Sequence, residues 1–399
     1  MKQQMRVLIA GAGIGGLTAA LALQKRGYQV TVCEQAAELR EVGAGLQLSP
    51  NALRALYQLG LEAPLRALAS EPDGKEIRLW NSGQTWKLFD LGATSVAKYG
   101  YPYYMMYRPD LHQVLADAVR AIDPAAIMLG AQCTGYEQDG QGVKLKLADG
   151  RVLEGDILVG ADGVHSKIRA QLIGPGKPVF SGCRAWRGVI PMDHLPHHLR
   201  RRVGTNWVGP GAHVIHYPLH NGELMNFVGI VERDDWQVES WTQQGTHEEC
   251  HADFAGWHED VHELIRHIGV PFKWALMARD PLQRWSEGRV TLLGDACHPT
   301  LPFLAQGAVM AVEDGYIIAR CLDKYASDPA LALKKYEAAR IERTNAIVLK
   351  STENGKRFHN PALASAEGAA AYVDREWAEP KVIDRYDWLF RYNVDEVEI

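Results

Sequence analysis

The order of apolar and polar residues along the chain predicts a strand, a helix and a second strand at its start. Residues 5–10 (MRVLIA) form a short apolar run, and the glycine-rich stretch GAGIGG follows it directly. The next segment, LTAALALQKRG, has the small and aliphatic residues of a helix packed on a sheet, and YQVTVCEQ is typical of a second strand that ends in an acid. This βαβ unit indicates an α/β fold with a parallel sheet.

The pattern changes in the middle of the chain. Around residues 143–160, alternation across an ADG turn predicts a hairpin, and DILVG then predicts a buried strand. Several alternating segments separated by Gly and Asn follow in residues 180–233, which is typical of an antiparallel sheet. RVTLLGD again has the character of a buried strand, AVMAVEDGYIIARCLDKY predicts a long helix, and the tail after about residue 330 is helical with a weakly patterned end.

The glycine-rich stretch has the spacing of a dinucleotide-binding fingerprint. Gly11, Gly13 and Gly16 stand between the first strand and the first helix, and Glu34 closes the next strand. The first glycine permits a tight turn, the second lets the backbone approach a pyrophosphate, and the third lets helix and strand pack closely. We expect the helix N-terminus, which includes Gly15, to bind the phosphates and Glu34 to accept hydrogen bonds from a ribose. The fingerprint alone leaves NAD and FAD open.

Composition and charge narrow the class of protein. Of 399 residues, 47% are hydrophobic and 23% charged, which is typical of a globular protein with a sizeable core, and the net charge of −5 argues against a nucleic-acid partner. The six cysteines are scattered without a CxxC pair, MKQQM leads directly into an apolar strand, and no apolar run is long enough to span a bilayer. We therefore expect a cytoplasmic protein with neither a metal site nor a membrane partner.

Two later stretches point to the cofactor through a family resemblance. GDILVGADGVHSKIR (residues 155–169) and GDACHPTLPFLAQGAVMAVED (residues 294–314) follow the N-terminal fingerprint in order. Together the three stretches resemble the signature of the single-component flavoprotein aromatic hydroxylases, and the resemblance spans roughly residues 5 to 345. It implies bound FAD, O2 as co-substrate, and NADH or NADPH that binds transiently because the chain has no second GxGxxG.

The resemblance also implies which residues surround the flavin. Asp295, at the end of a buried strand, would accept hydrogen bonds from the ribityl hydroxyls, and Pro302 would stiffen the loop beside the ring. Gly307 and Ala308 open the next helix, whose backbone N–H groups would approach the electron-rich edge of the ring. Taken alone, Asp295 would be interpreted as an ordinary helix or turn cap. By the same resemblance, further cofactor contacts come from Arg40, Gln47, Arg108 and Asp162.

These elements predict a Rossmann-like FAD-binding domain that is interrupted by an antiparallel β-sheet domain for the substrate. A helical C-terminal region follows, which we expect to contribute to a homodimer surface. The expected borders are 1–75, 100–178 and 275–330 for the FAD-binding domain, 76–99 and 179–274 for the β-rich domain, and 331–399 for the C-terminal region.

The stretch HVIHYPLHNGELMNFVG predicts the substrate site. Alternation places His213, Ile215 and Tyr217 on one face of a strand and Val214 and His216 on the other. The stretch is similar to that of family members that act on 3-hydroxybenzoate. By that resemblance, His213 removes the phenolic proton, Tyr217 hydrogen-bonds the substrate, and Tyr103 is a third pocket residue. The alternative is that these side chains are ordinary hydrogen-bonded or core residues of the sheet.

The chain departs from the family pattern in the loop that follows Asp295. It has Ala305 where the family often has Gly, and Pro302-Phe303 where the hydroxybenzoate members have a Gln-Tyr pair. Phe303 offers no hydrogen bond, so either another residue contacts the substrate carboxylate or the substrate differs.

The expected activity is that of an FAD-dependent NAD(P)H monooxygenase acting on a small hydroxylated aromatic acid. The resemblance favours conversion of 3-hydroxybenzoate to 2,5-dihydroxybenzoate. The alternatives are decarboxylating 1-hydroxylation of salicylate, hydroxylation of a hydroxypyridine carboxylate, and, from another class, a flavin redox sensor. A sensor would need no base for a phenol, so His213 and Tyr217 on one face argue against it.

Overall fold

The computed structural model describes residues 5–39, 44–235 and 243–399. One half of the molecule is built on a mostly parallel sheet of six strands. The strand order is β17-β18-β11-β1-β2-β7, and all neighbours are parallel except β17 and β18. These strands are β1 (Arg6–Ala10), β2 (Gln29–Cys33), β7 (Ile127–Met128), β11 (Ile157–Gly160), β17 (Ser286–Glu287) and β18 (Val290–Leu292).

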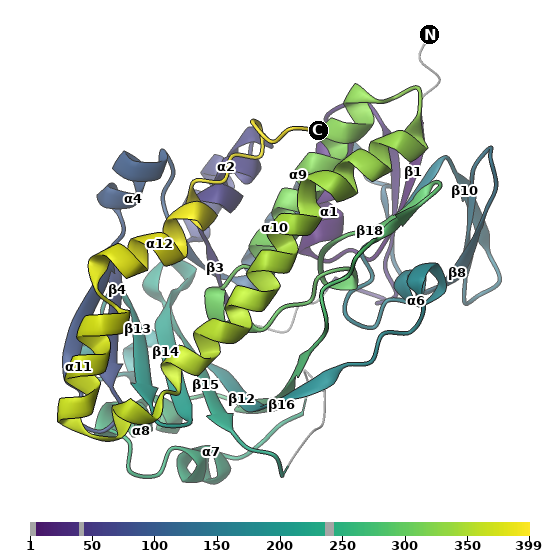
Figure 1. Cartoon of the computed structure of the whole chain (residues 1–399). Helices are drawn as coiled ribbons and strands as arrows, with labels where there is room; N and C mark the ends of the chain where they lie inside the picture. Colours follow the sequence, from purple (N-terminus) through teal and green to yellow (C-terminus); the bar gives the residue numbers. More distant parts are fainter. Residues whose placement is uncertain (1–4, 40–43, 236–242) are drawn as a thin grey trace.

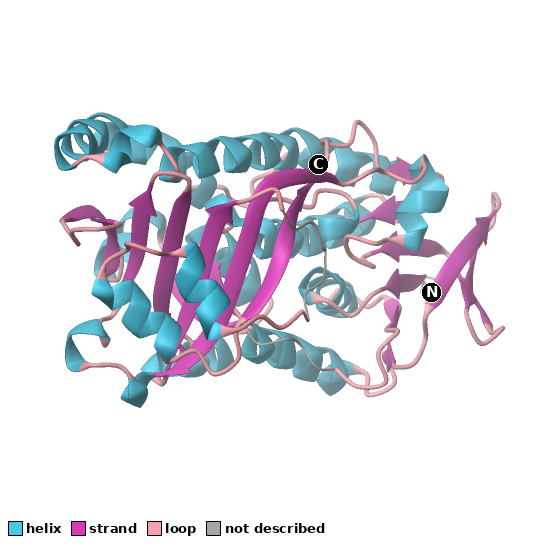
Figure 2. Cartoon of the chain, turned by 90° about the horizontal axis from the view of Figure 1, so that it is seen from below, coloured by secondary structure: helices cyan, strands magenta, loops and turns pink. Residues whose placement is uncertain are grey.

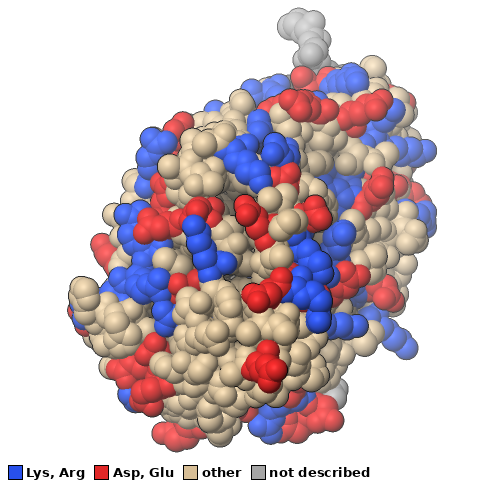
Figure 3. All heavy atoms as spheres, turned by 60° about the vertical axis from the view of Figure 1, so that its left-hand side comes forward, with Lys and Arg blue, Asp and Glu red and all other residues tan. Residues whose placement is uncertain are grey.

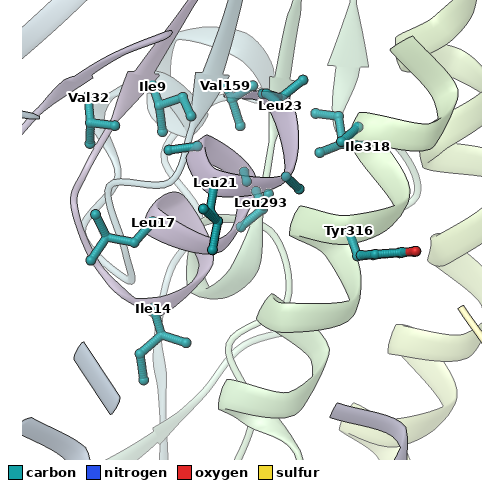
Figure 4. Packing of buried hydrophobic residues seen from close by; sticks show 14 of the residues in the cluster. Ile9, Ile14, Leu17, Leu21, Leu23, Val32, Val159, Leu293, Tyr316 and Ile318 are labelled. Carbon is teal, nitrogen blue, oxygen red and sulfur yellow. The ribbon is translucent and has the colours of Figure 1, made fainter. Parts of the chain in front are cut away.

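Helix α1 (Ile14–Gln24) is buried along its whole length between this sheet and other helices. Its Gly and Ala residues let neighbouring backbones approach, and its leucines fill the space between them. Figure 4 shows this cluster, with Ile9, Val32 and Val159 from the strands near Leu17 and Leu21 of α1, and Ile318 from α9 (Gly307–Lys324). Full burial of each such side chain contributes roughly 1.5–3 kcal/mol, so the cluster fixes the glycine turn that precedes α1.

A seven-stranded sheet forms the second half of the molecule, in the order β16-β12-β15-β14-β13-β4-β5. All neighbours are antiparallel except β4 and β13, a parallel pair that the sequence did not predict. The strands are β4 (Gly74–Leu79), β5 (Thr85–Asp90), β12 (Val179–Pro191), β13 (Val203–Gly209), β14 (Ala212–Leu219), β15 (Leu224–Glu232) and β16 (Phe272–Ala278).

The two faces of this sheet have different covers. On the outer face, Trp207, Val214 and Phe227 pack against α7 (His247–Asp253) and α8 (Glu259–Arg266), and Figure 2 shows short helices lying across the sheet. The inner face carries Ile77 and Leu79, which join Phe303 in another apolar cluster. That cluster takes in residues of the C-terminal helices, so the inner face lies between the sheet and the rest of the chain (Figure 1).

Smaller elements complete the fold and include a three-stranded sheet and a two-stranded sheet. They are the strands β3 (Gly45–Leu48), β6 (Tyr104–Tyr107), β8 (Cys133–Gln138), β9 (Val143–Leu147) and β10 (Val152–Gly155), and the helices α2 (Pro50–Gln58), α3 (Glu62–Leu68), α4 (Ala93–Tyr99), α5 (Arg108–Ile122) and α6 (Lys167–Ile173). Short 3₁₀ turns are η1 (Met192–His194), η2 (His197–Leu199), η3 (His220–Gly222), η4 (Gly294–Ala296), η5 (Pro302–Leu304) and η6 (Pro361–Ala364).

The C-terminal region is helical, as predicted. Helix α10 (Pro329–Phe358) runs from the parallel sheet to the seven-stranded sheet in Figure 1, and α11 (Ala366–Glu376) and α12 (Glu379–Phe390) follow beside the latter. Tyr372, Val373 and Val382 of these last helices belong to the same apolar cluster as Ile77. Helix α12 is regular although the sequence pattern of this segment is weak. The mixed α/β architecture, with an inserted sheet and C-terminal helices, is confirmed, whereas the domain borders and the dimer surface stay predictions.

The distribution of charge on the surface and the limited apolar character of the helices match what the composition indicates. In Figure 3, basic and acidic side chains are interspersed over the face that is drawn, without a continuous field of one sign. Among helices in the described parts of the chain, none has both the length and the apolar character needed to cross a membrane.

A buried ionic network joins α9 to α10. Arg340 of α10 contacts Asp314 at 2.7 Å and Glu313 at 2.7 Å, and Arg343 contacts Glu313 at 2.8 Å. Asp314 also pairs with His298 at 2.5 Å. Burial by itself would raise the pKa of Asp314, but His298 and Arg340 lower it to about 2, so the carboxylate is ionised. The network fixes α9 against α10 and thereby positions the loop that precedes α9.

We predict that Arg340→Met destabilises the fold by about 3–5 kcal/mol, because Glu313 and Asp314 would stay buried without their shared cation. The free energy of unfolding from urea titration measures this. Lys334→Met on the exposed side of the same helix is the matched control, with an expected change within about 0.5 kcal/mol. Equal stability of the two variants would contradict the assigned role of the network.

Candidate active site

The glycines in the turn after β1 differ in how much free space surrounds their Cα atoms. A Cβ at Gly11 (φ +104°) would lie 2.3 Å from the carbonyl oxygen of Ala161, and a Cβ at Gly16 would lie 2.1 Å from that of Gly11. A Cβ at Gly15 would lie 2.5 Å from the Leu293 side chain. These three glycines are therefore required by packing within the protein. By contrast, a Cβ at Gly13 would meet nothing within 4 Å, and no side chain caps α1 there. This is the space that a pyrophosphate needs.

Glu34 lies beside this turn. One carboxylate oxygen accepts a hydrogen bond from the Ala12 N–H at 3.0 Å, and the other accepts one from the Ala36 N–H at 2.9 Å. Each oxygen keeps a second lone pair, so Glu34 is held in place and can still accept from a ribose hydroxyl. Arg40, the other residue predicted for this end of the cofactor, lies outside the described residues.

The loop after β18 presents Asp295 to solvent. Gly294 and residues 296–298 are buried, whereas Asp295 is exposed and accepts no hydrogen bond from the residues that the structure describes. Gly11, Asp162 and Asp295 follow neighbouring parallel strands, so they meet at the carboxyl edge of the sheet, where ligands of such sheets bind.

The same loop ends at the start of a helix without a cap. Pro302 begins the turn η5, Ala305 takes the left-handed conformation (φ +54°, ψ +38°), and α9 starts at Gly307 with Ala308 in its first turn. Its N-cap, Gln306, forms no side-chain cap, which leaves the positive end of an 18-residue helix to a ligand. The backbone at Ala305 is left-handed, a conformation that costs a non-glycine residue roughly 1–2 kcal/mol. This cost explains why glycine suits the position in the family pattern.

The DG stretch supports this loop. Asp162 accepts hydrogen bonds from the Ser166 hydroxyl at 2.5 Å and the Lys167 N–H at 2.7 Å, which caps α6. From that helix Arg169 donates to the carbonyl of Ala296 at 3.3 Å. Asp162 thus positions Arg169, which holds the segment next to Asp295. A direct contact between Asp162 and the cofactor stays a prediction.

Arg108 opens α5, as the sequence predicts. Its backbone N–H donates to the carbonyl of Ala44 at 2.9 Å, which joins α5 to the start of β3. Its place at the flavin stays a prediction.

Gln47 and Tyr103 meet a lysine that the sequence analysis did not consider. Lys75 Nζ donates to Gln47 Oε1 at 2.5 Å and to the Tyr103 hydroxyl at 3.0 Å, and Tyr103 also donates to Gln47 Oε1 at 2.5 Å. Among the described residues, none forms an ion pair with Lys75. Burial lowers the pKa of Lys75 to about 7 and raises that of Tyr103 well above its usual value. Two neutral acceptors leave this ammonium without a counter-ion.

Tyr217 and Asn226 lie beside this group. The Gly45 N–H donates to Asn226 Oδ1 at 2.8 Å, and a Cβ at Gly45 would lie 2.7 Å from the Tyr217 hydroxyl. Burial raises the pKa of Tyr217, and a hydrogen bond with Gln47 opposes that rise. Asn226 Nδ2 is buried and has no hydrogen-bond partner within the described parts of the chain. An unsatisfied buried donor is costly and indicates a missing acceptor.

The inner face of the sheet is only partly covered between Tyr217 and His213. Ile215 and Val228 are opposite each other on the central strands, yet both are only partly buried. Their neighbours on the same face, including His213, Tyr217, Asn226 and Ile230, are buried. A partly exposed pair in the middle of a seven-stranded sheet indicates space above it. His213 lies at one end of this opening and Tyr217 at the other, about 13 Å apart along the strand at four residues of roughly 3.3 Å each.

His213 is fully buried in aromatic surroundings. Its ring centroid lies 5.6 Å from that of Phe303, the residue that departs from the family pattern, and 5.0 Å from that of Phe358. Phe303 in turn lies against α10, where a Cβ at Gly355 would come within 2.6 Å of its ring. Burial, followed by the nearby His359, lowers the pKa of His213 well below its usual value, so the imidazole is neutral. Its Nε2 has no hydrogen-bond partner in residues 5–39, 44–235 and 243–399.

The structure therefore groups the predicted residues in two sets. Gln47, Tyr103 and Tyr217 meet around Lys75, and His213 lies beside Phe303 at the other end of the opening. Lys75 left a signal in the sequence, because alternation places it with Ile77 and Leu79 on a face that is otherwise apolar. Neither Asn226 nor His359 shows such a signal, since their contacts join distant parts of the chain.

One buried cluster has the composition of a metal site. Ligand atoms of Cys297, His298 and Asp314 lie within 4.8 Å of one another. Asp314 already accepts from His298, from Arg340 and from the Gly294 N–H at 3.1 Å. A metal ion there would compete with the Arg340 guanidinium for the same carboxylate, so the geometry favours a structural role.

Comparison with known proteins identifies the family. The family described as FAD binding domain matches residues 4–351. The chain belongs to the family of FAD-dependent aromatic hydroxylases. The resemblance drawn from the three sequence motifs is therefore confirmed, and so are FAD as the cofactor and an enzymatic activity of the monooxygenase type.

Full-length relatives support this assignment of the hydroxylase. This chain is 39% identical over 400 residues to 3-hydroxybenzoate 6-hydroxylase 1 of Aquipseudomonas alcaligenes (98% of each chain). It is 38% identical over 393 residues to 3-amino-4-hydroxybenzoate 2-monooxygenase PtnB3 of Streptomyces platensis (98% of this chain, 97% of the relative). A solved structure, Klebsiella pneumoniae HpxO complexed with FAD and uric acid, matches with a TM-score of 0.84 at 25% identity, covering 100% of this chain and 98% of that one.

The residues of the hydroxylase fit FAD. Open space at Gly13, the exposed Asp295, and the uncapped start of α9 lie at one edge of the parallel sheet. The first would accommodate the pyrophosphate, the second would accept from the ribityl chain, and the third would lie against the electron-rich edge of the flavin ring.

We predict that Gly13→Val weakens FAD binding at least tenfold without unfolding the protein. The backbone at Gly13 (φ −72°, ψ 179°) suits any residue, and a valine there would fill only the space that the pyrophosphate needs. Fluorescence titration of the apoprotein with FAD measures the affinity, and thermal unfolding of the apoprotein measures the stability. Gly16→Val is the contrasting variant, since its side chain would collide with the backbone and unfold the turn. Normal FAD affinity of Gly13→Val would contradict this placement.

Proposed function

We propose that the hydroxylase adds one oxygen atom from O2 to a hydroxylated aromatic acid, with 3-hydroxybenzoate converted to 2,5-dihydroxybenzoate as the first candidate. The observation that carries the proposal is the inner face of the sheet. A neutral, buried imidazole with a bare nitrogen, His213, lies at one end of the opening, and an ammonium without a counter-ion, Lys75, lies at the other. Such an opening suits an aromatic ring that carries a phenol and a carboxylate.

Each residue then has a role that its chemistry supports. Lys75 binds the substrate carboxylate with the Tyr103 hydroxyl, and this pair replaces the hydrogen bond that Phe303 cannot provide. Asn226 Nδ2 and the Tyr217 hydroxyl donate to the ligand from the sheet. His213 Nε2 accepts the phenolic proton, which raises the electron density of the ring at the positions ortho and para to the oxygen.

FAD, reduced by NADH or NADPH, supplies the electrons that activate O2. The protein contributes orientation and a dry surrounding for the reacting ring. Ile215, Val228 and Phe303 are apolar, so they exclude water from the ring without competing for its hydrogen bonds.

A second candidate substrate is 3-amino-4-hydroxybenzoate, hydroxylated at carbon 2. The full-length similarity to an enzyme of that name favours it. Its hydroxyl and carboxylate lie opposite each other on the ring, which matches a base and a cation at opposite ends of the opening. Salicylate and hydroxypyridine carboxylates are further members of the same chemical class.

We predict that 3-hydroxybenzoate accelerates NADH oxidation by the FAD-loaded enzyme and yields 2,5-dihydroxybenzoate in equal amount. Chromatography of the product, with 3-amino-4-hydroxybenzoate, salicylate and 6-hydroxynicotinate in parallel, identifies the preferred substrate. Released CO2 would indicate the decarboxylating reaction on salicylate. NADH oxidation that forms only peroxide, whichever aromatic acid is present, would contradict the proposal and favour a redox sensor.

We predict that Lys75→Met raises the KM for the carboxylate substrate about 10- to 100-fold with a small effect on kcat, because one charge-assisted hydrogen bond of roughly 1.5–3 kcal/mol is lost. In the wild type, affinity should fall as the pH rises above about 7, since Lys75 loses its proton there while the carboxylate stays charged. Lys87→Met on the exposed β5 is the control. An unchanged KM and pH profile in Lys75→Met would exclude this contact.

A further inference from the structure

Three side chains form a hydrogen-bonded row from the opening to the surface. His213 Nδ1 lies 2.6 Å from His359 Nε2, and His359 Nδ1 lies 2.9 Å from Glu232 Oε1. His213 has no exposed surface and His359 is 6% exposed, whereas the Glu232 side chain is 56% exposed. The row therefore connects a fully buried nitrogen to water through a single intermediate residue.

The carboxylate at the outer end sets the proton positions along the row. A carboxylate only accepts, so His359 Nδ1 carries a hydrogen, and in the neutral imidazole its Nε2 is then an acceptor. His213 Nδ1 must therefore donate to that acceptor, which leaves His213 Nε2 without a hydrogen. This is the nitrogen that is buried without a hydrogen-bond partner among the described residues. Glu232 thus determines, through His359, that His213 presents a bare nitrogen to the substrate.

The surroundings of the row do not favour a lasting positive charge. Phe303 and Phe358 lie around His213, and burial lowers the pKa of both histidines, although Glu232 opposes this for His359. The charge of His359 further lowers the pKa of His213, and Glu232 is the charged group that acts on His359. A proton that His213 takes from a phenol must therefore move on.

We propose that His213, His359 and Glu232 form a proton relay that carries the phenolic proton of the substrate to water. The proposal rests on the proposed function, in which His213 is the base. The phenolic O–H bond breaks as a bond forms to His213 Nε2. The hydrogen on His213 Nδ1 passes to His359 Nε2, and that on His359 Nδ1 passes to Glu232, which releases it to water. One proton leaves for each phenolate formed, and no electrons move.

The relay resets by running in reverse. After the transfer, His359 Nε2 donates to His213 Nδ1, so the row stays hydrogen-bonded with inverted tautomers. When the phenolate of the product takes a proton back from His213 Nε2, a proton enters at Glu232 and restores the first arrangement. His359 is held for this role at the end of α10, where its carbonyl accepts from the Gly211 N–H at 3.2 Å.

Substrate binding to the oxidised, FAD-loaded enzyme without NADH tests the relay apart from turnover. In weakly buffered solution, stopped-flow absorbance follows phenolate formation from 3-hydroxybenzoate, and a pH indicator follows the released proton. The wild type should release one proton per phenolate. Glu232→Gln keeps the acceptor for His359 Nδ1 but cannot take its proton, so both signals should slow at least tenfold. His359→Gln interrupts the row and should slow them about 100-fold.

Controls separate the relay from structural damage. Glu223→Gln, at an exposed position just before the start of β15, should leave both rates unchanged. Benzoate, which has no phenol, should bind all variants with equal affinity. Wild-type rates of proton release in Glu232→Gln would overturn the relay. Because Glu232 is exposed, this variant alone tests the relay if His359→Gln does not fold. If the wild type hydroxylates 3-hydroxybenzoate while both variants keep their rates, only the relay fails. If the wild type binds no phenolic acid, the proposed function fails and the relay with it.

Discussion

The arrangement of the site depends on the buried pairing of Arg340 with Asp314 and Glu313. These charges join α9 to α10, and each helix carries a different part of the site. The start of α9 lies at the carboxyl edge of the parallel sheet. The far end of α10 is His359, roughly 28 Å along the helix from Arg340 at 1.5 Å for each of 19 residues. This buried ionic pairing thus relates the cofactor loop to the inner face of the second sheet.

The ionisable groups of the candidate site lie in dry surroundings. The pKa shifts of Lys75, Tyr103, Tyr217 and His213 all have burial as their largest cause, and in each case it disfavours the charged form. Charges interact more strongly in such surroundings than in water, so an anionic ligand and the Lys75 ammonium would stabilise each other. The same surroundings require that a transferred proton has a defined exit.

The sequence allowed most of the fold and part of the site to be predicted. Local sequence patterns predicted the glycine turn, the parallel strands and the alternation that places His213 and Tyr217 on one face. Contacts between distant segments were not predictable, because no short pattern encodes them. The parallel pairing of β4 with β13 and the approach of His359 to His213 are of this kind. Lys75 is intermediate, since a charged residue in an apolar register is visible locally but its partners are not.

Close contact between Phe303 and Gly355 has a consequence for redesigning substrate preference. The aromatic ring beside His213 occupies the space that a side chain on α10 would take, so the loop and the helix are sterically matched. Grafting the corresponding loop of a relative into this chain would leave a cavity or a clash against α10 unless position 355 changes with it. Loop and helix should therefore be exchanged as a pair, and in natural variants these two positions should covary.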